Sequence, residues 1–126
     1  MYKKLLFGFI ACGLLTIVVA SCTITGTNTS ALPAVHMGAA DFIQHSVTIH
    51  KGDMLNLIDD APSPHLIMNG RWVNGVQKPA KEPGAPTVNH MYVGNDSAPI
   101  GPFTTAGTFY LYCTTHLNMN LTVIVQ

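Results

Sequence analysis

The strongest constraint on the fold is a strict two-residue alternation of side chains near the C-terminus. One run places Phe109, Leu111 and Cys113 on a single face. The next run does the same with Met119, Leu121, Val123 and Val125. Successive side chains of a strand point to opposite faces, so a period of two predicts strand rather than helix. The pattern therefore predicts two consecutive strands whose inward faces meet near Cys113 and Met119.

Shorter segments with the same period precede these two strands. Val47 and Ile49 share one face of a run, Leu55 and Leu57 share a face of the next, and a further run begins at His65. We expect an edge strand over 87–93, and a long surface loop over 69–86 with Trp72 on an irregular flank. Eleven glycines and eight prolines separate the runs. The whole predicts an all-β, antiparallel Greek-key sandwich of two sheets over 35–126, with about 6–8 strands.

The N-terminal segment is typical of an export signal. Lys3 and Lys4 precede an apolar run of 16 residues from Leu5 to Ala20, which is short of the about 20 residues that a transmembrane helix needs. The run ends at Val-Ala-Ser-Cys22, which resembles the lipobox of bacterial lipoproteins. We therefore predict a signal peptide over 1–21, a lipidated Cys22 and a flexible tether over 22–34. An uncleaved anchor or an ordinary secretory signal is the alternative, and either would also place the domain outside the cytoplasm.

The charge balance limits the kinds of partner that we expect, and the cysteine content limits the chemistry of the site. Six basic residues balance six acidic ones, and only 10% of residues are charged, so we expect no nucleic-acid partner. Cys12 leaves with the signal and Cys22 carries lipid, so the exported domain keeps Cys113 as its lone thiol. A thiol retained in an oxidising compartment is usually buried, catalytic or bound to a metal.

The residues around Cys113 favour a metal. Cys113, His116 and Met119 follow the spacing Cys-x2-His-x2-Met on one connection between two strands. A thiolate, an imidazole and a thioether suit copper, whose electron-transfer sites use two His, one Cys and a weak axial Met. Zinc is the chemical competitor because Cys and two His also suit a tetrahedral site, and Met119 argues against it. His65, which follows a proline-rich turn and begins a strand, is the candidate for the second His.

These segments together resemble the cupredoxins, the small blue copper proteins. The stretch DDAPSPHLI (59–67) is similar to the loop and strand that supply their first His, and 107–113 and 119–123 are similar to their last two strands. The short ligand loop is closest to the plastocyanin and amicyanin type. The resemblance implies one type 1 copper ion held by His65, Cys113 and His116, with Met119 axial.

Two positions depart from the family's usual pattern. Thr115 stands where plastocyanin-like members often carry Pro, and it supplies a backbone N–H able to donate to the Cys113 sulfur. Such a bond would favour Cu(I) and raise the reduction potential. Asp60 stands where relatives commonly have Asn, and an ionised carboxylate can only accept hydrogen bonds. A lock between the two ligand loops through this side chain is therefore not expected.

The function predicted from these features is membrane-tethered electron transfer by a monomer, on the extracytoplasmic face of a membrane, in the periplasm or at the cell surface. The expected partners are membrane-proximal redox proteins, such as a cytochrome or an oxidase-type donor or acceptor. The alternative is an extracytoplasmic copper-binding or delivery protein. We do not expect an enzyme: the chain has no His-x-His pair and no second Cys between Cys113 and His116. The copper oxidases and dinuclear copper centres require such residues.

Overall fold

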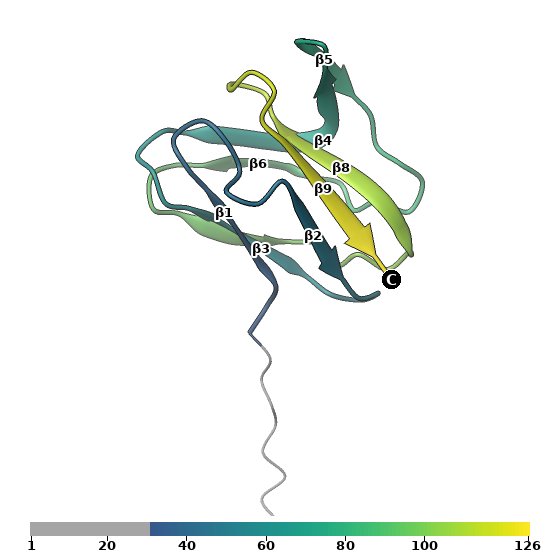
Figure 1. Ribbon diagram of the computed structural model, residues 1–126. Helices are drawn as coiled ribbons and strands as arrows, with labels where there is room; N and C mark the ends of the chain where they lie inside the picture. Colours follow the sequence, from purple (N-terminus) through teal and green to yellow (C-terminus); the bar gives the residue numbers. More distant parts are fainter. Residues whose placement is uncertain (1–30) are drawn as a thin grey trace, which may run out of the picture.

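The computed structural model describes residues 31–126, which form two facing β-sheets (Figure 1). The strands of this part of the chain are β1 (Ala34–Met37), β2 (Ser46–Ile49), β3 (Leu55–Asp59), β4 (His65–Val73), β5 (Val76–Pro79), β6 (Asn89–Tyr92), β7 (Ser97–Ile100), β8 (Gly107–Cys113) and β9 (Asn120–Val125). The predicted signal peptide, Cys22 and most of the predicted tether lie outside the described residues. Across 31–126, no helix has the length and apolar character needed to cross a membrane.

The two sheets differ in size. The smaller has the order β1-β3-β7, and the larger has the order β2-β9-β8-β4-β5, with β6 also paired to β4. The predicted all-β sandwich is confirmed. However, the described residues contain nine strands instead of the expected 6–8, and β1–β3 and β2–β9 are parallel pairs. Alternation has the same period in parallel and antiparallel strands, so a sequence pattern cannot distinguish the two pairings.

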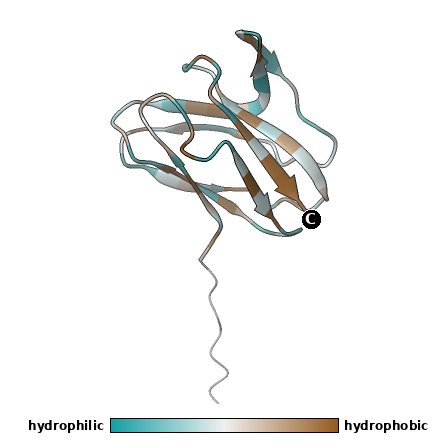
Figure 2. Cartoon of the chain, in the orientation of Figure 1, coloured by the Kyte–Doolittle hydropathy of each residue, from teal (hydrophilic) through white to brown (hydrophobic). Residues whose placement is uncertain are grey.

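The core lies between the sheets and follows the predicted alternation. The inward faces of β8 and β9 are fully buried, including Leu111 and Leu121, which face each other across the pair. Ile124 points outward and is 38% exposed. Figure 2 shows the apolar segments concentrated along these central strands. Burial of this continuous apolar face is the main force that holds the last two strands in place.

The predicted loop over 69–86 is in large part a β-hairpin, which is a correction to the sequence prediction. β4 continues to Val73, the chain turns at Asn74-Gly75, and β5 returns to Pro79. Both turn residues have left-handed backbone angles, with φ of 50° and 73°. Asn-Gly is the preferred sequence for such two-residue turns because both residues tolerate positive φ. The hairpin projects at the same end of the sandwich as the β8–β9 loop (Figure 1).

Candidate metal centre

The strand register brings the predicted ligands from distant parts of the sequence to one end of the sandwich. His65 is the first residue of β4 and Cys113 the last of β8. These strands are antiparallel neighbours in which Ile67 is paired with Cys113. His65 lies two residues from Ile67 and so shares its buried face. The loop that carries His116 begins directly after Cys113.

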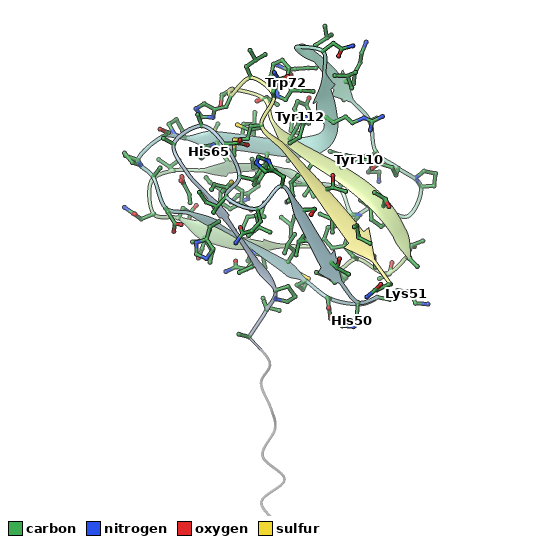
Figure 3. All side chains as sticks on the ribbon, in the orientation of Figure 1. His50, Lys51, His65, Trp72, Tyr110 and Tyr112 are labelled. Carbon is green, nitrogen blue, oxygen red and sulfur yellow. The ribbon has the colours of Figure 1, made fainter. Side chains whose placement is uncertain are left out.

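Three predicted donors meet at this end. The ligand atoms of His65, Cys113 and His116 all lie within 4.8 Å of one another. The Cys113 sulfur is 3.4 Å from His116 Nδ1, and the centroids of the two imidazole rings are 4.7 Å apart. His65 and Cys113 are completely buried, whereas His116 is partly exposed. Figure 3 shows His65 inside the sandwich beneath the β8–β9 loop. The structure therefore brings together three of the four side chains predicted as metal ligands.

Met119 is held beside these residues by the backbone of the loop. The Cys113 N–H donates to the Met119 carbonyl at 3.1 Å, and the Met119 N–H donates to the His116 carbonyl at 3.3 Å. Asn118 turns the chain with a φ of 61°. The Met119 side chain is fully buried. Its role as an axial ligand stays a prediction.

The burial and the unpaired ring nitrogens of His65 are those expected of a metal ligand. Neither ring nitrogen has a hydrogen-bond partner among the described residues, although both are buried. Leaving a buried polar group unsatisfied costs about 1–3 kcal/mol, a cost that a bound metal ion would relieve at one nitrogen. Burial lowers the pKa of His65, opposed by the buried Asp59 carboxylate, whose Oδ1 lies 3.6 Å from Nε2. A neutral imidazole is the form that coordinates metals.

Comparison with solved structures finds the same β-sandwich in other proteins. The sequence matches no known family profile and no curated protein sequence. Among solved structures, amicyanin from Paracoccus versutus (Thiobacillus versutus) superposes with a TM-score of 0.60 at 22% identity, covering 77% of this chain and 83% of amicyanin. An oxidised amicyanin variant gives a TM-score of 0.58 at 19% identity, covering 80% and 88%. A reduced variant gives 0.57 at 20% identity, covering 75% and 82%. The chain has the cupredoxin fold.

Within this cupredoxin fold, Thr115 contacts the Cys113 sulfur in a way that differs from the prediction. The Thr115 hydroxyl oxygen lies 3.1 Å from the sulfur and forms a hydrogen bond with it, whereas the Thr115 backbone N–H does not. The same hydroxyl lies 3.5 Å from the Pro64 carbonyl. Thr115 therefore links the loop before β4 to the sulfur of Cys113. Sequence spacing could not reveal this contact because it depends on the side-chain rotamer.

Within residues 31–126, the Asp60 side chain makes no hydrogen bond to the loop that carries His116. Its exposed carboxylate accepts from His36 at 2.7 Å, which ties it to β1. The loops are instead joined through the backbone, where the Thr114 N–H donates to the Leu66 carbonyl at 2.9 Å. The remaining histidines of the described chain, at 36, 45, 50 and 90, lie outside the donor cluster.

Two residues that the sequence pattern did not predict hold the ligand loop of this cupredoxin fold. The indole N–H of Trp72 donates to the Cys113 carbonyl at 2.8 Å, and the Gln77 side chain donates to the Thr114 carbonyl at 3.1 Å. Trp72 also packs edge-on against Tyr112, with ring centroids 6.2 Å apart (Figure 3). The Asn74-Gly75 turn was the available signal, since it predicts a hairpin that carries both side chains.

Proposed function

We propose that this protein carries single electrons through one type 1 copper ion, held by His65, Cys113 and His116 with Met119 as the axial ligand. The observation that carries the proposal is the convergence of a buried thiol and two imidazoles within 4.8 Å. Bound copper supplies a one-electron Cu(II)/Cu(I) couple, and this donor set suits both oxidation states. The amicyanin-like fold supports the same conclusion.

The chain's own residues keep these donors in fixed positions. His65 and Cys113 lie within paired strands, and Met119 is joined by backbone hydrogen bonds to Cys113 and to His116. A rigid donor set changes little when the metal changes charge, which favours fast electron transfer. His116 reaches the surface beside Leu117, which is 66% exposed. Of the four proposed ligands, His116 is the one that reaches solvent.

The proposal extends to location and partners. The pattern of residues 1–22 supports an exported lipoprotein tethered through Cys22, and this would favour membrane-proximal redox proteins as partners. We propose a carrier and not an enzyme, because the described residues form one cluster of metal-type side chains and the other histidines lie apart from it.

The test is a visible and electron paramagnetic resonance spectrum of the protein loaded with Cu(II). We expect an intense thiolate-to-copper absorption band that is lost in Cys113→Ser and in His65→Ala. The matched control is His50→Ala, since His50 is exposed and lies outside the cluster; this variant keeps the band. A colourless Cu(II) complex of the unmodified protein would refute the proposal.

Copper delivery is the competing function, and metal exchange separates the two. The complete burial of His65 and Cys113 predicts slow loss of copper to a chelator, together with fast redox cycling. Rapid loss of copper at neutral pH would support delivery instead.

A further inference from the structure

Most of the basic side chains of the described domain lie on or next to one hairpin. Residues 31–126 contain six acidic and four basic residues, and three of the basic ones are Arg71, Lys78 and Lys81. Arg71 and Lys78 are directly opposite each other across β4 and β5, and both are exposed. None of these three forms an ion pair within the described chain, where each ion pair involves a histidine. Like charges in opposed positions are unfavourable unless an anion lies near them.

Residues 71–74, the β4 arm and the first turn residue of this hairpin, form one wall of a surface groove. The groove has a volume of about 470 Å³ and is also lined by side chains of β8 and β9, including Tyr110 and Asn120. The Arg71 guanidinium lies 4.5 Å from the centroid of the Tyr110 ring. A cation held over an aromatic face is preorganised and remains able to donate hydrogen bonds from its edge. The groove therefore presents a fixed positive group suited to carboxylates.

One residue connects the groove to the candidate metal centre. Trp72 lines the groove, and its indole N–H donates to the carbonyl of Cys113 at 2.8 Å. The turn of the same hairpin also approaches the ligand loop, because a side chain at Gly75 would contact Leu117. A partner bound in the groove would thus lie one hydrogen-bonded side chain away from the backbone of the thiolate ligand.

We infer that the β4–β5 hairpin and its groove form a docking surface for an acidic protein that carries a one-electron redox centre. The carboxylates of the acidic protein would bind Arg71 and Lys78. Trp72 acts as the positioning residue between the docked partner and Cys113. In the redox step one electron passes between the partner's centre and the metal site. One is oxidised as the other is reduced, and no covalent bond or proton moves. This step rests on the proposed function, whereas the docking itself does not.

The position and lining of the groove favour an acidic protein over an anionic membrane. The hairpin lies at the end of the sandwich opposite to residue 31, where the described chain begins (Figure 1). The groove is also lined mainly by polar and aromatic groups, which suit a folded acidic surface more than lipid chains.

Binding is tested by NMR titration of the full, copper(I)-loaded chain with polyglutamate as a carboxylate-bearing polypeptide. We expect chemical-shift changes centred on β4, β5 and the Trp72 indole. Affinity should fall about three- to tenfold in the double variant Arg71→Gln/Lys78→Gln and stay unchanged in Lys51→Gln, which removes the basic residue at the β2–β3 turn. Shifts elsewhere, undiminished binding by the double variant, or binding only to phosphatidylglycerol vesicles would overturn the docking surface.

The redox role is tested by oxidising the Cu(I) protein with one-electron reagents of opposite charge. With the anion hexacyanoferrate(III), the rate should fall about three- to tenfold in the double variant at low salt, and with tris(phenanthroline)cobalt(III) it should not fall. Trp72→Phe, which removes the indole donor to the Cys113 carbonyl, should slow the anionic reagent more than the cationic one. Equal rates for all variants would overturn the role of the hairpin in electron transfer. Hairpin binding by a chain with no blue copper spectrum would instead leave the docking surface standing and refute the proposed function.

Discussion

Asn120 is predicted to be the main anchor of the β4–β5 hairpin. The Trp72 N–H donates to its Oδ1 at 2.7 Å, and its Nδ2 donates to the Trp72 carbonyl at 3.1 Å. The Asn120 side chain thus hydrogen-bonds to both the N–H and the carbonyl of Trp72, as the backbone of a neighbouring strand would. A hydrogen bond contributes about 1 kcal/mol net, so Asn120→Ala should lower the free energy of unfolding by about 2 kcal/mol. For a domain of this size that corresponds to a fall in Tm of roughly 8–16 °C.

The assay is urea and thermal unfolding of the metal-free protein, followed by Trp72 fluorescence and by circular dichroism. Asn120→Asp keeps the acceptor but removes the donor, so the free energy of unfolding should fall by at least half as much as in Asn120→Ala. The control is Asn89→Ala, because Asn89 is exposed on β6 and its side chain makes no hydrogen bond within 31–126. A loss below about 0.5 kcal/mol in Asn120→Ala, the size of an ordinary surface substitution, would show that the hairpin is held by other contacts.

Two further predictions concern the core and the pH dependence of stability. Leu111→Ala should lower the free energy of unfolding by about 2–5 kcal/mol because it opens a cavity at a fully buried position. Ile124→Ala, on the outer face of the same sheet, should lower it much less. Similar losses for the two variants in denaturant unfolding would contradict the assigned strand faces. Burial, aided by Asp96, raises the pKa of Tyr92, whose hydroxyl donates to the Ala98 carbonyl. The folded state then keeps a proton that the unfolded chain loses near its ordinary pKa of about 10. The contribution of Tyr92 to stability should therefore be constant below about pH 10 and be lost as the pH rises further. Tyr92→Phe should flatten that fall. An equal fall in the variant, measured by urea midpoints across this range, would count against the assignment.

The parts of the fold that the sequence predicted are those with long apolar faces. β8 and β9 have seven and six residues, enough for the alternation to stand out. β5 has four exposed residues and so carries no such signal. Glycine and proline content alone predicts a loop here, because it does not reveal the left-handed turn geometry of Asn74-Gly75.

The candidate site was predictable to the level of residue type and strand face. Cys113, His116 and Met119 stand close in sequence, and the position of His65 at the start of a strand suggested that it shares their end of the sandwich. The contacts around them were not predictable. The approach of the Thr115 hydroxyl to the sulfur and that of Asp59 to His65 depend on side-chain rotamers. The contact of the same hydroxyl with the Pro64 carbonyl depends on the pairing of segments 51 residues apart.

The separation of His65 from the other three candidate ligands has a consequence for biosynthesis. Three donors lie within a seven-residue stretch, but the fourth reaches them only when β4 has paired with β8. If the protein is exported as proposed, the extended chain would offer an incomplete and weak site while it crosses the membrane, and tight binding of the proposed metal would wait until the sandwich has formed. Acquisition of metal would then act as a checkpoint that only correctly assembled molecules pass.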